Sequence, residues 1–190
     1  MCGIAGKIHL TSKLISMGEL KIMARTIKHR GPDDSGMFIS DNQKIGLVNQ
    51  RLAIIDLTSA GHQPMSFKNR YWITFNGEIY NFQEERKKLE KSGYKFRSKT
   101  DTEVILALYD KYETGCLKYL RGMFAFAIYD SKENTLFLAR DRIGKKPLKY
   151  FHSPSVFIFA SELKAILTQP EVKRAVDWVA VHDYLTYGFT

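Results

Sequence analysis

The strand-like segments of this chain come in clusters and do not alternate one by one with helices. Residues 3–10 alternate in side-chain character, with Ile4, Gly6, Ile8 and Leu10 on one face, as in a half-buried strand. Further strands are expected at residues 37–41, 45–56, 71–76, 122–130, 135–140, 148–152 and 156–160. Strict alternation would predict a doubly wound parallel sheet, whereas clusters favour stacked antiparallel sheets flanked by helices. We therefore predict an α+β fold of that kind.

Helices are expected at a few positions between these strands. Residues 16–29 carry apolar side chains at helical spacing, and residues 81–92 form a polar helical stretch that ends at Gly93. Thr100 and Glu103 have the spacing of a capping box and open a third helix. A last helix is expected from residue 161 to about residue 167, and residues 30–36 are rich in turn formers and predict a loop.

Composition narrows the class of protein. The 190 residues suffice for one substantial core, and 29 Lys and Arg against 20 Asp and Glu leave a net charge of +9, which suggests an acidic partner. The longest apolar run, residues 123–129, is far below the roughly 20 residues of a membrane helix. Cys2 and Cys116 cannot build a disulfide framework, and the first residues lack a secretory pattern, so we expect a cytoplasmic protein.

Cys2 is the first candidate for chemistry, because it follows the initiator methionine directly. Removal of Met1 would give one residue both a thiol and a free α-amino group. Such an amine has an ordinary pKa of about 7.7–8.0 and can accept the thiol proton at neutral pH. Cys2 would then be a nucleophile that carries its own base. The alternative is a cysteine that occupies this position by chance.

Asn76 and Gly77 form a second candidate site after the strand at residues 71–76. An asparagine amide beside a glycine N–H can offer two donors to a developing oxyanion, as acyl transfer requires. The same dipeptide is also the commonest signal of a tight hairpin turn. Both interpretations stay open on these residues alone.

Arg51 and Asp101 offer opposite charges. Arg51 interrupts an apolar strand, and a guanidinium can hold a carboxylate through two hydrogen bonds. Asp101 could hold an ammonium group or could simply favour the positive end of its helix. Together they suit the zwitterionic head of an amino acid, whereas separately each could be an ordinary surface charge or cap.

Seven motifs in fixed order give these candidates a common context. They are MCGIAG at 1–6, RGPDDSG at 30–36, NQRLAIID at 49–56, GHQPM at 61–65, FNGEIYN at 75–81, SKTDTE at 98–103 and ARDRIGKKPL at 139–148. Over about residues 2–168 the chain resembles the glutaminase domain of glutamine-hydrolysing asparagine synthetases, which are class II glutamine amidotransferases.

The resemblance implies a fold, a reaction and a set of roles. The fold would be that of the amino-terminal-nucleophile hydrolases, a four-layer αββα sandwich, and the reaction would be hydrolysis of L-glutamine to glutamate and ammonia through a thioester. Cys2 would be the nucleophile, and Asn76 with the Gly77 backbone would form the oxyanion hole. Arg51 would take the α-carboxylate of glutamine. The remaining pocket residues would be Asp101 and Glu78 at the α-amino group, with Leu52, Ile54 and Ile55 as backbone lining.

The resemblance also implies a partner. Residues 2–168 would be the glutaminase domain, and residues 169–190 would be a connector toward a synthetase domain that this chain does not contain. That second domain would use ATP and magnesium, whereas the glutaminase domain would need no cofactor and no metal. A homodimer is also compatible with the family. A related amidotransferase with a different acceptor for the ammonia is the main alternative.

A basic nucleic-acid-binding module is the remaining alternative, from a different class of protein. Its support is the net charge and basic clusters at residues 86–91 and 140–146. Glutamates lie among the lysines of the first cluster, which is typical of a solvated helix face, and neither cluster belongs to a nucleic-acid motif. We therefore expect no nucleic-acid partner and no membrane partner.

Overall fold

The strands form two antiparallel sheets. The structure is a computed structural model and describes residues 1–189. The first sheet has the order β2-β3-β1-β9-β8, and its members are β1 (Gly3–His9), β2 (Asp34–Ile39), β3 (Ile45–Arg51), β8 (Lys149–His152) and β9 (Val156–Ala160). The second has the order β4-β5-β6-β7, with β4 (Met65–Phe67), β5 (Tyr71–Ile79), β6 (Gly122–Asp130) and β7 (Thr135–Arg140). All pairings are antiparallel, as the clustered pattern predicted.

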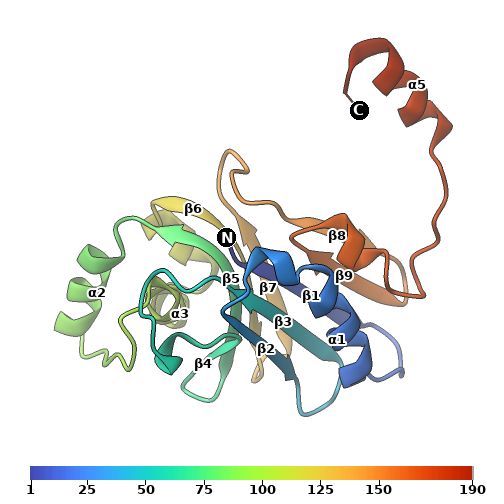
Figure 1. Cartoon of the computed structure of the whole chain (residues 1–190). Coiled ribbons are helices and arrows are strands. Elements are labelled where there is room, and N and C mark those ends of the chain that lie inside the picture. Colours follow the sequence, from blue (N-terminus) through green and yellow to red (C-terminus); the bar gives the residue numbers. More distant parts are fainter. Residues whose placement is uncertain (190) are drawn as a thin grey trace.

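Helices cover the outer faces of both sheets (Figure 1). Helices α1 (Met17–Thr26) and α4 (Leu163–Ile166) pack on the first sheet, while α2 (Phe82–Lys91) and α3 (Asp101–Tyr112) pack on the second. Short 3-10 turns follow or link these elements at Lys28–Arg30, Ser59–Gly61 and Glu113–Tyr119. A third apolar cluster, which includes Leu47 of β3 and Ala127 of β6, fills the space between the sheets. The four-layer αββα sandwich is therefore confirmed.

The helix starts follow local capping chemistry. Ser16 and Glu19 form a complete capping box at α1, which the sequence reading did not single out. At α3, the Thr100 hydroxyl accepts a hydrogen bond from the Glu103 N–H as predicted. The Glu103 carboxylate does not return to Thr100; it accepts hydrogen bonds from the backbone N–H groups of Arg97 and Ser98 instead. The predicted capping box at α3 is thus only half formed, because Glu103 ties down the preceding loop.

Three strand boundaries differ from the prediction, and all three matter for the site. Strand β2 begins at Asp34, inside the predicted loop, and β3 ends at Arg51 rather than at residue 56. Strand β5 continues through Asn76 and Gly77 to Ile79, because its backbone stays paired with β6. The hairpin-turn interpretation of Asn76-Gly77 is therefore wrong.

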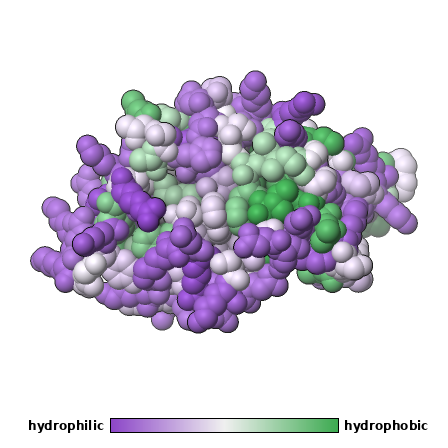
Figure 2. Space-filling view, turned by 90° about the horizontal axis from the view of Figure 1, so that it is seen from below, coloured by the Kyte–Doolittle hydropathy of each residue, from purple (hydrophilic) through white to green (hydrophobic). Residues whose placement is uncertain are grey.

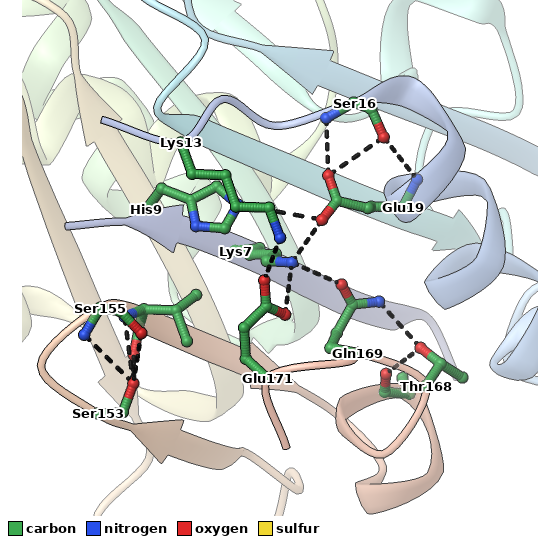
Figure 3. A network of polar contacts seen from close by, with 12 residues as sticks. Lys7, His9, Lys13, Ser16, Glu19, Ser153, Ser155, Thr168, Gln169 and Glu171 are labelled. Atoms are coloured by element: carbon green, nitrogen blue, oxygen red, sulfur yellow. Dashed lines mark hydrogen bonds and ion pairs between the residues drawn. The ribbon is translucent and has the colours of Figure 1, made fainter. Parts of the chain in front are cut away.

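Lys7 is a fully buried cation on the helix-covered face of β1. Its ammonium donates hydrogen bonds to Glu19 of α1 at 2.6 Å, to Gln169 at 3.0 Å and to Glu171 at 2.9 Å (Figure 3). His9 lies beside these carboxylates, within 4.0 Å of Glu19. A buried charge is tolerated only when it is paired in this way. The network therefore fastens the segment after α4 to both α1 and β1.

The last helix, α5 (Trp178–Tyr187), stands apart from the sandwich at the end of an extended segment (Figure 1). None of its residues is buried, and Trp178 and Leu185 are among its exposed apolar side chains. The molecular surface seen from below is mostly hydrophilic, and the largest hydrophobic area in this view lies to the right of centre (Figure 2). No helix in residues 1–189 is long and apolar enough to cross a membrane.

Candidate active site

Cys2 lies at the entrance to β1, in the wall of a cavity of about 300 Å³. Its Sγ accepts a hydrogen bond from the Leu52 N–H at 3.4 Å and lies 3.6 Å from the Leu52 carbonyl oxygen. Burial raises the pKa of the Cys2 thiol, although the Leu52 hydrogen bond, the terminal ammonium and Arg51 act in the opposite direction. The thiol is therefore positioned by the fold but needs a base to become a nucleophile.

The backbone at Cys2 is held from two sides. Strand β1 begins to pair with β3 at Gly3, opposite Gln50. On the other side, the Arg30 Nε donates to the Cys2 carbonyl at 3.0 Å while its Nη1 contacts Glu162 at 2.9 Å. Arg30 was read from the sequence only as part of a turn-rich motif. A cation beside glycine and proline is common in turns, so this pattern alone does not predict a contact with Cys2.

Asn76 reaches the cavity from the middle of β5. Its side chain is buried, and neither its Nδ2 nor its Oδ1 has a hydrogen-bond partner within residues 1–189. Gly77 follows it where β5 and β6 approach closely, since a Cβ there would collide with the Met123 carbonyl oxygen. A buried amide without a partner costs free energy, and the hydrogen-bonding capacity of Asn76 is unused within residues 1–189 in the wall of this cavity.

Arg51 closes one side of the cavity and shapes the loop beyond β3. Its guanidinium donates to the carbonyl oxygens of Ile55, Asp56 and Thr58. Gly61 packs directly against this guanidinium, in space that a Cβ would need. The strand ends at Arg51 because the side chain folds the next residues around itself. The loop consequently brings Leu52, Ile54 and Ile55 to the cavity.

Asp101 lies at the start of α3 and carries a carboxylate that is almost fully buried. Its Oδ2 accepts a hydrogen bond from the Ile79 N–H at 3.0 Å. Burial raises the pKa of the Asp101 carboxyl to about 6, and the charge of Glu78 adds to this effect, while three backbone N–H groups oppose it. A cation delivered by a ligand would relieve this unfavourable charge.

The structure brings together every residue that the sequence reading placed in the site. These residues line one cavity: Cys2, Arg51, Leu52, Ile54, Ile55, Asn76, Gly77, Glu78 and Asp101. Four further polar residues of its wall were not predicted as site residues, namely Gln63, Thr100, Thr102 and Lys146. The Gln63 side chain accepts from the Phe75 N–H at 2.7 Å and from Asn49 at 3.1 Å, which braces β5 against β3.

Metal ions are held by several donor atoms that lie close together. The one group with suitable donor spacing in residues 1–189 is His9, Glu19 and Glu171, whose ligand atoms lie within 4.8 Å of one another. Both carboxylates are already bonded to the Lys7 ammonium (Figure 3). This cluster lies on the helix-covered side of β1, and we interpret it as an ion-pair network.

Comparison with solved structures identifies the fold, and comparison with family models identifies the family. The chain superposes on the glutamine phosphoribosylpyrophosphate amidotransferase of Bacillus subtilis with a TM-score of 0.73, over 87% of this chain and 43% of that chain, at 21% identity. The two proteins therefore share the amino-terminal-nucleophile amidotransferase fold. The model of the glutamine amidotransferase domain matches residues 1–190. The chain belongs to this family.

Within this family, the chain is similar to asparagine synthetases. It is 42% identical to a putative glutamine-hydrolysing asparagine synthetase 2 of Methanocaldococcus jannaschii, over 100% of this chain and 40% of the relative. It is 39% identical to asparagine synthetase 3 of Bacillus subtilis, over 99% of this chain and 31% of the relative. The chain thus matches the glutamine amidotransferase domain of these asparagine-synthetase relatives, and it spans well under half of their length.

Proposed function

We propose that this domain hydrolyses L-glutamine to glutamate and ammonia through a thioester on Cys2. The observation that carries the proposal is the unpartnered amide of Asn76 in the same cavity as the Cys2 thiol. A donor held ready without a partner is the form that electrostatic stabilisation of an oxyanion takes in acyl transfer. The family to which the chain belongs supports the same reaction.

The reaction uses the two functional groups of Cys2 after Met1 has been removed. The α-amino group takes the thiol proton, and the sulfur attacks the γ-carbonyl carbon of glutamine. The negative charge that develops on the carbonyl oxygen would be held by the Asn76 amide and the Gly77 N–H. The carbon–nitrogen bond then breaks, and ammonia leaves with the proton from the Cys2 ammonium. Water subsequently cleaves the thioester and releases glutamate.

The charged head of glutamine would lie between Arg51 and Asp101. The Arg51 guanidinium would receive the α-carboxylate, while Asp101, assisted by Glu78, would receive the α-ammonium. The electrostatics of the cavity support this assignment, because Asp101 is a buried carboxylate whose raised pKa reflects burial without an ion-pair partner among residues 1–189. The backbone of Leu52, Ile54 and Ile55 would line the remaining wall.

The nucleophile is tested by a Cys2→Ala variant, with ammonia release from glutamine measured on protein whose amino terminus has been verified by mass spectrometry. We expect a loss of several orders of magnitude, since only binding and oxyanion stabilisation remain. The matched control is Cys116→Ala, which removes the second, buried thiol far from the cavity and is expected to retain activity. Equal ammonia release by the Cys2→Ala variant and the parent would refute the assignment.

We further propose that residues 2–168 act as the glutaminase domain and that residues 169–190 connect it to an ATP-dependent synthetase domain. The support is that the chain covers only 40% and 31% of the length of two asparagine-synthetase relatives. The glutaminase reaction needs no ATP or magnesium, whereas the synthetase domain would need both. Incubation of the full-length protein with glutamine, aspartate, ATP and magnesium should yield asparagine. Ammonia transfer to a different carboxylate would instead indicate another acceptor.

A further inference from the structure

Lys146 places a cation in the wall of the active-site cavity. The residue is only 4% exposed, and its side chain lines the same cavity as Cys2. Within residues 1–189, the single hydrogen bond of its ammonium is to the Met1 sulfur, at 2.8 Å. No carboxylate of residues 1–189 lies within ion-pair distance of it. A buried ammonium without a counter-charge is unusual, because its desolvation is uncompensated.

The turn that carries Lys146 is firmly held. The carboxylate of Asp141 accepts hydrogen bonds from the N–H groups of Phe124, Lys145 and Lys146, at 3.2, 2.8 and 2.9 Å. The Arg140 Nε donates to the Lys146 carbonyl at 2.6 Å. The backbone position of Lys146 is therefore fixed by the end of β7, unlike that of an ordinary surface lysine.

Removal of Met1 changes the surroundings of this ammonium. Met1 is bonded to the nitrogen of Cys2, so its departure frees the α-amino group. It also removes the one hydrogen-bond partner that the Lys146 ammonium has among the described residues. Both groups then border the space that the methionine side chain filled. We propose that Lys146 acts through Cys2 as a positioning residue, its positive charge keeping the α-amino group neutral and favouring the thiolate. This inference rests on the proposed function.

The chemistry of the proposed reaction benefits from such a charge at two steps. A nearby cation disfavours protonation of an amine, so more of the amine is available as a base at neutral pH. The same cation stabilises the thiolate as the proton moves from sulfur to nitrogen. The resulting ammonium is also a stronger acid, which helps it to protonate the leaving ammonia. No atom is added or lost, because Lys146 contributes only its charge.

Among the other charges around Cys2, Arg51 acts in the same direction on the thiol, since its charge lowers the pKa of Cys2. Glu78 and Asp101 are anions of the cavity wall and act in the opposite direction. Arg51 is bonded to three loop carbonyls and is assigned to the glutamine carboxylate. Arg30 contacts the Cys2 carbonyl but is neutralised by Glu162. Lys146 is thus the cation of this wall whose charged group contacts no oxygen acceptor within residues 1–189, whereas that of Arg51 contacts three.

The test compares neutral and charged replacements of Lys146. The variants Lys146→Met and Lys146→Gln remove the charge, and Lys146→Arg keeps it. All are made in a Cys116→Ala background, so that Cys2 is the only thiol. Each is produced behind a protease site whose cleavage leaves Cys2 as the first residue, and intact mass and melting temperature are checked first. Two neutral variants are used so that one remains if the other fails to fold.

The primary readout is the rate of Cys2 alkylation by iodoacetamide as a function of pH. We expect the midpoint to rise by about one pH unit in the neutral variants and to change little in Lys146→Arg. A neutral variant that is folded and alkylates with the midpoint of the parent would overturn the inference, as would an equal rise in Lys146→Arg.

A second readout separates this inference from the proposed function. The acidic limb of kcat/KM for glutamine should move by the same amount as the alkylation midpoint in the neutral variants. A purely structural role for Lys146 would lower activity without moving that limb, and this result would also count against the inference. Alkylation needs no glutamine, so a shifted midpoint in a protein without glutaminase activity would refute the proposed function and leave the Lys146 effect standing.

Discussion

Asp101, a proposed binding group, lowers the free energy of unfolding of the protein without ligand. Because burial raises the folded-state pKa of its carboxyl to about 6 from 3.8, ionisation of Asp101 opposes folding. This penalty is absent below about pH 3.8, grows between the two pKa values and is complete above about pH 6. The protein tolerates the cost, we infer, because the glutamine ammonium compensates the carboxylate in the complex.

An Asp101→Asn variant should therefore gain stability and lose substrate affinity. Asparagine can still accept the hydrogen bond from the Ile79 N–H but carries no charge. We expect the free energy of unfolding, measured with urea at pH 7.5, to be about 1–3 kcal/mol larger than in the parent, because the pKa shift that is removed is roughly two units. The KM for glutamine should rise at least about tenfold.

The pH dependence supplies the control for Asp101→Asn. Near pH 4 the parent carboxyl is mostly protonated, so the variant and the parent should unfold at similar urea concentrations. A stability difference that is the same at pH 4 and pH 7.5 would show that the charge of Asp101 is not the cause.

Individual site residues differed in how far the sequence could specify them. Cys2 and Arg51 stood out in the sequence, because a cysteine after the initiator methionine and an arginine in an apolar strand are unusual, but their proposed roles came from the family resemblance. The role of Asn76 was ambiguous, since a hairpin turn and a strand present the same dipeptide until the pairing with β6 is known. Arg30 and Lys146 were missed, because only the fold brings them to the amino terminus. Arg30 contacts Cys2 across 28 positions of the sequence, and Lys146 contacts Met1 across 145 positions.

The loop after β3 depends on close packing between Gly61 and the Arg51 guanidinium. A Gly61→Ala variant should move the guanidinium, because the added Cβ occupies its space. The guanidinium is buried and donates to three loop carbonyls, so we expect the free energy of unfolding to fall by about 1–3 kcal/mol as it is displaced. The KM for glutamine should rise about tenfold or more, while kcat changes less.

The matched control for this variant is Gly115→Ala. A Cβ at Gly115 would meet nothing closer than the Tyr112 Cβ, at 4.0 Å. It should leave both kinetic parameters unchanged. If Gly61→Ala and Gly115→Ala behave alike in steady-state kinetics, Arg51 does not set the affinity for glutamine.

The Lys7 network should be essential to the packing of α1 and the segment after α4. A Lys7→Met variant leaves the carboxylates of Glu19 and Glu171 facing each other without their shared cation. We expect a loss of about 3 kcal/mol in urea unfolding, typical of one partner removed from a buried ion pair. Adding Glu19→Gln and Glu171→Gln should recover most of that loss.

Two comparisons make the Lys7 prediction specific. Lys13 also binds Glu171, at 2.7 Å, but is half exposed, so Lys13→Met should cost little. Burial alone would raise the pKa of Glu171, yet hydrogen bonds from Lys13 and Lys7 hold it lower, at about 2. Its stabilising contribution is thus complete above the ordinary value of 4.5 and is lost as the pH falls toward 2. Lys7→Met should weaken this acid sensitivity.

For the whole molecule, the structural boundary of the sandwich can be located by truncation. Helix α5 buries no residue, whereas Gln169 and Glu171 are bonded to Lys7. A chain that ends at residue 175 should melt within about 2 °C of the parent. A chain that ends at residue 168 loses both bonds and should melt about 6–12 °C lower. Equal melting of the two truncated chains would show that residues 169–175 do not stabilise the fold.

The arrangement of the two sheets could be predicted from the sequence, whereas the ends of individual strands could not. Clustered strands and few helices were enough to predict stacked antiparallel sheets, because each strand pattern reports which face is buried. The end of β3 and the length of β5 were not predictable, since they depend on the Arg51 side chain and on pairing with β6. The Lys7 network was also invisible in the sequence, because its partners are 12 to 164 residues away.

The unpartnered Asn76 amide has a practical consequence for assays of this protein. A ligand that supplies its missing hydrogen bonds binds only the folded state, so it must raise the melting temperature. At a ligand concentration of one hundred times Kd, the gain is about 2.7 kcal/mol. Heat-induced unfolding of the Cys2→Ala variant therefore becomes a titration of glutamine affinity in a protein that cannot consume its ligand.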